Sequence, residues 1–370
     1  TANGGIQLDN AGHVTVDGVQ IPTAGQLSNR NLIINGAMQV AQRGSGNFAI
    51  GDDSYPVDRF LFSNGGTGFT GGANGTQSTT APAGFKNSLE VDITTADTSL
   101  SADSQGKIEY RVEGYDSAHL NWGTANAQIV TLSFYIKSNV TGETAVALVN
   151  QGNNMSYVAT FNINTANTWE RKEITVAGPT DGTWNTSNGI GIRIRWGSFG
   201  NQYQTTSTNQ WVSTQKMTSN SSINFFSSTD NNLFLAGVQL EVGEKATPFE
   251  HKSYGDEFAK CLRYYFKPDC DGNAKQGMMG ISYSANTYYI PFQLPIPMRA
   301  APTLVAEGGN NWRSRTNNVN AFDVTWTYHG YITPSNVTIQ TTGGSIAAGT
   351  PFWFETHSNS GCNLEFDAEL

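Results

Sequence analysis

Apolar and polar residues alternate along several stretches of the chain. In residues 130–138 every second side chain is apolar, so four of them share one face: Val130, Leu132, Phe134 and Ile136. Residues 171–176 and 190–196 alternate in the same way, and residues 233–242 form a further apolar run. A period of two is typical of half-buried β-strands, and Gly- and Asn-rich turns separate these strands. The pattern predicts an all-β protein whose main domain, residues 29–250, is an antiparallel β-sandwich.

The first 28 residues show a different pattern. They contain three short apolar pieces with turns between them: Ile6 and Leu8, Val14 and Val16, and Val19 and Ile21. Each piece is too short to bury itself, so the segment has to pack against another chain or another protein. We therefore expect residues 1–28 to form an extended docking or stem segment. The alternative interpretation is a frayed terminus.

One stretch after the sandwich predicts a helix. Ser253 precedes Asp256 by three positions, which resembles a capping box. Apolar residues then follow at helical spacing on one face: Phe258, Cys261, Leu262 and Tyr265. Pro268 ends the pattern. We expect a connecting helix within residues 251–268 and a smaller C-terminal β-domain at residues 269–370, where strand patterns resume at 288–290 and 322–326.

Composition narrows the functional classes. Charged residues form 14% of the chain and aromatic residues 11%; soluble proteins average about 25% charged residues, and the aromatic share argues against disorder. The net charge of −9 and the lack of a basic stripe predict no nucleic-acid partner. The sequence has no run of about 18 apolar residues, which predicts no membrane insertion. Three cysteines cannot all pair with one another, which indicates no disulfide scaffold and is compatible with assembly in a reducing cytoplasm.

Five stretches carry a family resemblance. Residues 31–44 read NLIINGAMQVAQRG, and residues 55–60 read YPVDRF. Residues 236–250 contain AGVQLEVG and then ATPFE, residues 261–265 read CLRYY, and residues 297–303 read PMRAAPT. In order and spacing these stretches resemble the distal part of bacteriophage tail fibre proteins. The resemblance implies a homotrimeric virion protein that contacts other tail or capsid proteins and acts in host attachment.

The first large domain also resembles carbohydrate-binding modules of the jelly-roll fold. The matching parts are the Asn-Gly opening, the strand at 130–138 and the closing strand at 233–242. This resemblance implies a sandwich whose loops or concave face hold glycan, but it does not identify the binding residues. A tail fibre normally has a long N-terminal shaft and a tail-docking domain, whereas 28 residues precede the sandwich here. Either the chain is truncated, or residues 1–28 are the docking peptide of a short appendage on the tail or capsid.

Aromatic side chains are the candidates for glycan contact, because the C–H face of a sugar stacks on an aromatic ring. We select rings in Gly/Asn/Ser-rich stretches and in the C-terminal domain: Trp184, Tyr203, Trp211, Trp312, Trp326, Tyr328 and Tyr331. The alternative for each is packing in a core or between subunits. Trp196 lies on the apolar face of its strand, and we expect it in the core. Arg313 and Arg315 could pair with acidic sugars, although solvated loop charge is the default interpretation.

Catalytic and metal-binding patterns are weak. The sequence has no G-x-S-x-G elbow, phosphate loop or H-E-x-x-H motif, and its five histidines are scattered. A calcium loop is a candidate at Asp269, Asp271 and Asn273, but the later acidic ligand is absent and a plain turn explains the residues. We expect no cofactor and no enzymatic activity. Two catalytic carboxylates far apart in sequence stay open as an alternative.

Three functions compete on this evidence. The first is a receptor-binding tail fibre that recognises host-surface polysaccharide, and the second is a capsid-surface decoration or fibre protein with the same modules. The third is a tailspike that cleaves polysaccharide, although the short repeats of the parallel β-helix common in such enzymes are not evident. The first two differ in what residues 1–28 contact, and all three place the protein in a virion assembled in the host cytoplasm.

Overall fold

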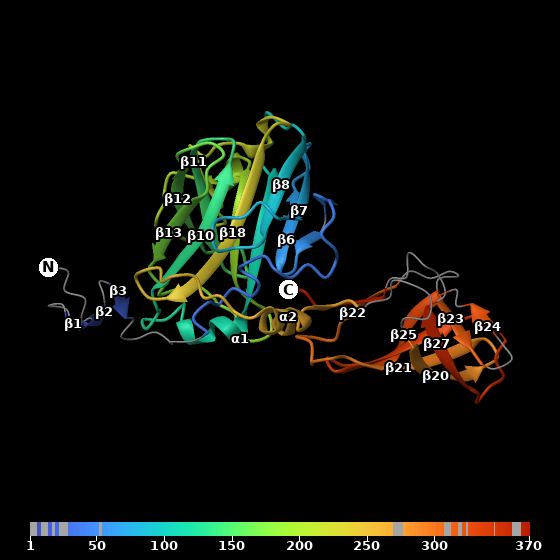
Figure 1. The fold of residues 1–370 in the computed structure, drawn as a ribbon. Coiled ribbons are helices and arrows are strands. Elements are labelled where there is room, and N and C mark those ends of the chain that lie inside the picture. The colour runs from blue at the N-terminus through green and yellow to red at the C-terminus, as the bar shows by residue number, and fades with distance from the viewer. Residues whose placement is uncertain are drawn as a thin grey trace. The chain divides into compact units, whose positions relative to one another are not determined.

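The computed structural model describes residues 6–8, 14–16, 19–21, 29–51, 54–268, 277–306, 312–316, 320–322, 325–343, 345–356 and 364–370 (Figure 1). The chain divides into two compact units, Thr1–Tyr254 and Gly255–Leu370. Strands dominate both units and helices are few and short. The prediction of an all-β fold is therefore confirmed.

The first unit contains an antiparallel sandwich of jelly-roll type. Its six-stranded sheet has the order β13-β10-β18-β8-β7-β4, with β4 at Phe48–Ala49, β7 at Gly72–Ser78, β8 at Ser88–Thr95, β10 at Val130–Ser138, β13 at Glu170–Val176 and β18 at Asn232–Val242. Its seven-stranded sheet has the order β16-β12-β11-β14-β9-β6-β5, with β5 at Ser54–Val57, β6 at Phe60–Gly65, β9 at Gln105–Glu113, β11 at Gly142–Val149, β12 at Ser156–Ile163, β14 at Ile190–Phe199 and β16 at Trp211–Val212.

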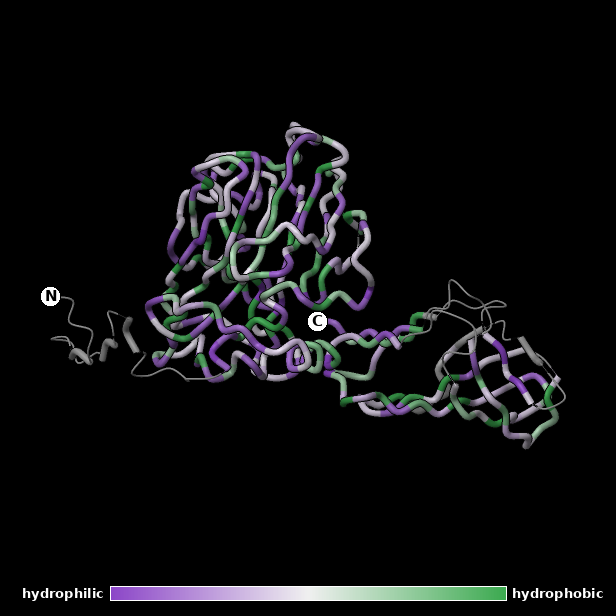
Figure 2. Tube along the Cα trace, in the orientation of Figure 1, coloured by the Kyte–Doolittle hydropathy of each residue, from purple (hydrophilic) through white to green (hydrophobic). Residues whose placement is uncertain are grey.

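The core lies between these two sheets, where the predicted faces meet. The alternating side chains of β10 are each at most 1% exposed: Val130, Leu132, Phe134 and Ile136. Trp196 on β14 is 2% exposed and packs against Phe134, as predicted from its strand position. Hydrophilic and hydrophobic residues alternate along the sandwich strands in Figure 2. Period-two alternation therefore decided which side chains enter the core.

A second apolar cluster lies on the outer face of the seven-stranded sheet. Residues 200–222, here called the strap, contain η2 (Asn201–Tyr203), β15 (Gln204–Thr205), β17 (Thr218–Ser219) and the edge strand β16. Strap side chains Tyr203 and Met217 are buried against Ala147 and Val149 of β11 and Val158 of β12. The strap therefore closes part of a sheet face that would otherwise be exposed.

The start and end of the sandwich are joined by hydrogen bonds, which we call the clasp. The Asn31 side chain donates from Nδ2 to the Val238 carbonyl at 3.1 Å and accepts from the Leu240 amide at 3.0 Å. The Asn31 amide donates to the Glu250 carboxylate at 3.0 Å. A Cβ on Gly36 would lie 2.1 Å from the Val238 carbonyl oxygen, so this position requires glycine.

The clasp joins two stretches that carry the family resemblance, 31–44 and 236–250, and further hydrogen bonds join the stretch 55–60 to the first of them. Asn35 donates from Nδ2 to the carbonyls of Val40 at 2.8 Å and Asp58 at 3.0 Å. The Asp58 carboxylate in turn accepts from the Gln42 amide at 2.9 Å. These bonds therefore hold the opening segment of the domain against residues 55–60, which is a structural role.

The remaining elements of the first unit are small. Strands β1 (Ile6–Leu8), β2 (Val14–Val16) and β3 (Val19–Ile21) form a three-stranded antiparallel sheet at the three predicted apolar pieces. Helix α1 (Gly114–Ser117) and η1 (Ala118–Leu120) follow β9, and η3 (Phe225–Ser227) precedes β18.

The C-terminal unit begins within helix α2, Tyr254–Leu262. The helix is shorter than the predicted range 251–268, and the prediction that Tyr265 lies on its apolar face is wrong. The chain leaves the helix after Leu262, and Tyr265 belongs to strand β19 (Tyr265–Phe266), where it pairs with Asp367. Backbone pairing with a distant strand thus overrides the helical spacing. All of the helix except Tyr254, the last residue of the first unit, belongs to the C-terminal unit.

Two sheets complete this unit. The small sheet has the order β19-β28-β22, with β22 at Thr303–Ala306 and β28 at Leu364–Asp367. The larger sheet has the order β24-β23-β27-β20-β21-β26-β25, with β20 at Gly277–Ser284, β21 at Thr287–Gln293, β23 at Trp312–Arg315, β24 at Asn320–Phe322, β25 at Thr325–Ile332, β26 at Asn336–Thr342 and β27 at Pro351–Thr356. The predicted single strand at 322–326 spans the end of β24 and the start of β25, and residues 323 and 324 lie outside the described residues.

The other two stretches with the family resemblance, 261–265 and 297–303, also meet. The Arg299 amide donates to the Arg263 carbonyl at 2.8 Å, and the Arg299 guanidinium donates to the carbonyls of Ala368 and Glu369 at 2.8 and 3.0 Å. The Ala368 amide donates to the Tyr264 carbonyl at 2.8 Å. This second clasp fastens the last residues of the chain to the turn after α2.

Candidate ligand-binding surfaces

Two predicted glycan contacts, Trp184 and Trp211, come together in the sandwich. Their ring centroids are 5.4 Å apart, and Trp122 packs edge-on against both, at 4.8 Å from Trp184 and 5.5 Å from Trp211. Tyr157 contacts Trp211 at 5.4 Å. Trp184 and Trp211 are half-buried, whereas Trp122 and Tyr157 are buried. The cluster therefore presents partial ring surfaces to solvent.

Hydrogen bonds fix these indole rings. The Nε1 atoms of Trp122, Trp184 and Trp211 donate to the carbonyls of Gln128, Asp181 and Ala177 at 2.9, 3.1 and 2.7 Å. Amide side chains lie beside the cluster, with Asn185 Nδ2 donating to Gln151 Oε1 at 2.9 Å. Fixed rings beside polar side chains are the ingredients of a glycan contact.

The structure buries two of the other predicted rings. Tyr203 is 6% exposed because the strap folds it onto the outer face of the seven-stranded sheet, where its hydroxyl accepts from Gln105 Nε2 at 2.9 Å. Trp312 is fully buried and stacks on Phe354 at 5.1 Å in the C-terminal core. For both residues the structure favours the packing alternative, because neither offers an open ring face.

The remaining candidates lie where side chains are not described. Trp326, Tyr328 and Tyr331 belong to strand β25, of which the structure describes the backbone at these positions. The calcium candidates Asp269, Asp271 and Asn273 lie outside the described residues. Within the described residues, no group of three or more His, Cys, Asp or Glu side chains is arranged to hold a metal ion.

The larger C-terminal sheet exposes a continuous apolar face that sequence reasoning missed. Seven large apolar side chains are exposed in the described part of the chain, and four of them lie on this face: Met279 at 56%, Ile281 at 47%, Tyr283 at 69% and Trp353 at 51%. Met279 lies directly opposite Trp353 across β20 and β27, and Tyr283 contacts Tyr289 of β21 at 5.2 Å. The sequence of β20 and β27 indicates this face, because apolar residues occupy both sets of alternating positions and only one set can enter the core.

Charged side chains border this face on β23. Arg313 donates from Nε to Glu355 Oε1 at 2.7 Å, and Arg315 Nη1 lies 3.2 Å from the same oxygen. Arg315 lies opposite Trp353 in the strand register, and its side chain is 46% exposed. Both arginines are therefore strand residues, not the loop residues that their sequence context suggested.

A cluster of charges on the outer face of the sandwich was also missed. Glu109 of β9 is fully buried, and its carboxylate accepts from Arg111 Nε at 2.5 Å, from Arg193 Nη1 at 2.7 Å and from Arg195 Nε. Burial opposes ionisation of Glu109, but attraction to the three guanidinium groups outweighs it. The pKa of this carboxyl therefore lies well below its ordinary value.

Lys107 extends the cluster along β9. Its Nζ donates to Gln105 Oε1 at 3.0 Å. Burial, together with repulsion from the nearby arginines and opposed by attraction to Glu109, lowers the pKa of Lys107 from 10.5 to about 8. The sequence signal was charged residues at every second position of β9 and β14, on the face opposite the apolar side chains.

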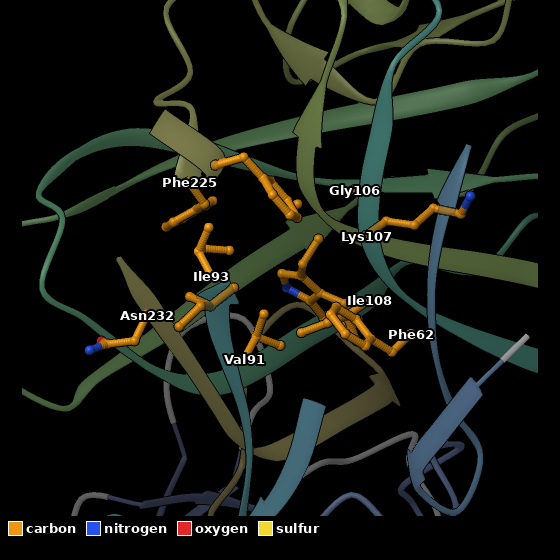
Figure 3. A pocket seen from close by; sticks show the side chains of 12 residues that line it. Phe62, Val91, Ile93, Gly106, Lys107, Ile108, Phe225 and Asn232 are labelled. Atoms are coloured by element: carbon orange, nitrogen blue, oxygen red, sulfur yellow. The ribbon is translucent and has the colours of Figure 1, made fainter. Parts of the chain in front are cut away.

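A cavity inside the sandwich is too small to be a ligand site. It lies between β8, β9 and η3, and residues such as Val91, Ile93, Ile108 and Phe225 line it (Figure 3). Its volume of about 20 Å³ suits a single water and no sugar ring. Trp196 also lines this cavity, and its buried indole Nε1 has no hydrogen-bond partner within the described residues.

Comparisons with known proteins assign no family. No protein-family model matches the sequence, and no curated protein matches it. The solved structures that match include the enzymatically active domain of tailspike protein 4 from bacteriophage CBA120, with 10% identity, a TM-score of 0.31 and coverage of 58% of this chain but only 22% of that one. A xylan-binding domain from Paenibacillus barcinonensis matches with 12% identity, a TM-score of 0.29 and coverage of 53% of this chain and 99% of that one.

A putative sugar binding protein from Bacteroides thetaiotaomicron also matches, with 11% identity, a TM-score of 0.29 and coverage of 58% of this chain and all of that one. At these TM-scores the matches carry no argument for the function of this chain. Within the described residues, no helix has the length and apolarity required to span a membrane.

Proposed function

We propose that this chain is a structural protein of a bacteriophage particle, a tail fibre or similar appendage, that binds host-surface polysaccharide without cleaving it. The five stretches that resemble tail fibres support the assignment to a virion. They also fit together physically, because four of them form the two clasps and the fifth, 55–60, bonds to the stretch 31–44. A homotrimer is part of the proposal and comes from the same resemblance.

The observation that carries the binding function is the exposed face of the larger C-terminal sheet. Soluble proteins rarely expose contiguous large apolar side chains without a partner. Trp353 and Tyr283 supply exposed rings, and strands hold both side chains in position. A rigid platform of this kind loses little conformational entropy on binding.

A glycan suits this face for two reasons. The C–H faces of sugar rings stack on aromatic rings, whereas their hydroxyls need nearby hydrogen-bonding groups. Arg315 lies beside Trp353, and Thr287 and Gln293 lie on β21 next to the apolar row. The half-buried cluster of Trp184 and Trp211 is a second candidate contact in the sandwich, with amide side chains beside it.

The test is binding of the full chain to an array of bacterial surface glycans. The double variant Trp353→Ser and Tyr283→Ser should bind at least about tenfold more weakly than the wild type, because each lost ring contact costs on the order of 1 kcal/mol or more. Tyr115→Ser is the matched control, since this tyrosine is 60% exposed but lies in the sandwich. The control should bind as the wild type does.

Three outcomes would contradict parts of the proposal. Equal binding by the double variant and the wild type would remove the C-terminal face as the glycan site. Shortening of the polysaccharide during incubation would assign the chain to the cleaving enzymes. A reconstruction of the particle that places the chain only on the capsid shell would replace the tail fibre with a capsid decoration protein.

A further inference from the structure

The outer face of β9 and β14 carries more positively charged side chains than carboxylates to neutralise them. Arg111 lies directly opposite Arg193 in the strand register, and like charges in that position repel. Glu109 is the acceptor that the arginines share. Even if Arg111 is left aside, Lys107, Arg193 and Arg195 face one carboxylate, which leaves a surplus of two positive charges.

This surplus is costly because the side chains are partly withdrawn from water. The side chains of Arg195 and Arg193 are 5% and 14% exposed. The Arg193 Nε is buried and has no hydrogen-bond partner within the described residues. A buried donor and an uncompensated charge both destabilise the free protein, so an external anion would relieve both.

Among the described residues, the positions of β11 and β6 directly opposite these cations carry no anion. Ala147 and Val149 of β11 lie opposite Arg195 and Arg193. Ser63 of β6 lies opposite Lys107 on the other side. Glu113, the next acidic residue on this face of β9, lies two positions beyond Arg111 and away from Lys107.

Lys107 is directed to the same side of the sheet. Its side chain runs away from the cavity inside the sandwich (Figure 3), and Gln105 holds its amine at 3.0 Å. Lys107, Arg193 and Arg111 are half-buried and reach solvent, whereas Glu109 and Arg195 lie beneath them. The cations therefore form an accessible layer over a buried ion pair.

We propose that this face binds an oxyanion, the carboxylate or sulfate of an acidic saccharide, on Lys107 and Arg193, with the buried Arg195 adding positive charge from beneath. The oxyanion site stands on the cluster itself, and only the saccharide as carrier of the anion rests on the proposed function. Guanidinium groups match the planar geometry of a carboxylate, and the ammonium group adds a compact charge. The buried Glu109 orients the arginines and stays ionised.

The experiment titrates the full chain by calorimetry at pH 7 and low salt with three probes. These are sodium sulfate, an oligogalacturonate, and the methyl ester of the same oligomer, which lacks the charge. We expect the two anions to bind and the ester to bind at least about tenfold more weakly than the acid. The variants Lys107→Met and Arg193→Gln should each weaken anion binding about tenfold or more, as expected for a direct charged contact.

Lys216→Met is the matched control, because Lys216 lies in the strap and donates to the Gln202 carbonyl. It removes one positive charge outside the cluster and should leave anion binding unchanged within about twofold. A second readout is the pKa of Lys107 by nitrogen NMR. Saturating anion should raise it from about 8, because a bound negative charge favours the protonated amine.

Three outcomes overturn the proposal. If neither anion binds, or if Lys107→Met binds them as tightly as the wild type, the cluster is a structural network only. If Arg193→Gln changes the oligomeric state and leaves anion binding intact, the face is a subunit contact. If sulfate binds and the oligogalacturonate does not, the result supports the oxyanion site and excludes an acidic saccharide as the carrier of the anion. The glycan array distinguishes this site from the glycan face of the proposed function. If the Trp353 and Tyr283 double variant loses array binding and Lys107→Met keeps it, the C-terminal face binds the glycan without the oxyanion site.

Discussion

The two seven-stranded sheets present very different outer faces. In the sandwich, β9 and β14 carry ionised side chains that bond to one another around Glu109. In the C-terminal unit, β20 and β27 carry exposed Met279, Ile281, Tyr283 and Trp353. Both sheets alternate in the same way and bury their other face. Alternation therefore determines which side chains point away from the core, and their chemistry determines what the outer face does.

The two faces should also differ in what they contribute to stability. The Glu109 network is withdrawn from water, so breaking it leaves buried charge without a partner. The C-terminal rings are already half or more exposed, so removing them takes little buried area from the folded state. Breaking the first face should therefore cost more stability than truncating side chains on the second.

The largest effect should come from the network. Glu109→Gln keeps the shape of the side chain but leaves Arg195 buried without its counter-ion. We expect a loss of about 3–5 kcal/mol in the free energy of unfolding, measured by urea denaturation at pH 7. Glu173→Gln is the control: Glu173 pairs with Arg171 at a site where its side chain is 48% exposed, and its loss should cost at most about 0.5 kcal/mol. Similar values for the two variants would show that the network does not support the fold.

Substitution of Lys107 should have an intermediate effect of opposite sign, because it should stabilise the protein. The folded-state pKa of about 8 lies below the ordinary 10.5. Protonation of this lysine therefore lowers the free energy of unfolding, and this penalty reaches its full size below pH 8. The wild type should gain stability as pH rises from 8 toward 10.5, because the folded state loses its proton first. Lys107→Met should be more stable than the wild type by roughly 1 to 3 kcal/mol at pH 7, and this difference should shrink across the same pH window. A Lys107→Met variant that is less stable at pH 7 would contradict the excess of positive charge.

The smallest effect on folding is expected at the exposed C-terminal face. Trp353→Ser should change the free energy of unfolding by no more than about 0.5 kcal/mol, as is usual at exposed positions. Phe354→Ala, at the next position of β27 but fully buried, should cost about 3–5 kcal/mol. Thermal unfolding of both variants and the wild type measures these losses in the free energy of unfolding. A large loss for Trp353→Ser would mean that the ring supports the fold and is not available for a ligand.

The sequence predicted the fold well where the pattern is local. The strand at 130–138 coincides with β10, and the apolar runs near 171, 190 and 233 coincide with β13, β14 and β18. The helix was found, but its end was not. Tyr265 fits the helical spacing, yet its place is set by pairing with Asp367, about 100 residues later in the chain, which local spacing does not encode.

The candidate sites were harder to predict because they depend on contacts between distant segments. Tyr203 lies in a polar stretch, but the strap folds it onto β11. Trp312 begins a strand between Asn311 and Arg313, two polar neighbours, and its burial follows from stacking on Phe354. The cluster around Glu109 needs β9 and β14 to be adjacent, although they are about 80 residues apart. In contrast, selecting rings in Gly- and Asn-rich stretches did find Trp184 and Trp211.

The clasp has a mechanical consequence for a protein of this kind. Residue 29 enters the sandwich and residue 250 leaves it at neighbouring points, because Asn31 bonds to Val238, Leu240 and Glu250. A pulling force applied between these two points would load the few hydrogen bonds of the clasp and leave both sheets unstretched while the clasp holds. Under tension the force would then pass through the clasp and not through the sheets. The first step of forced unfolding would be the release of Asn31 from β18.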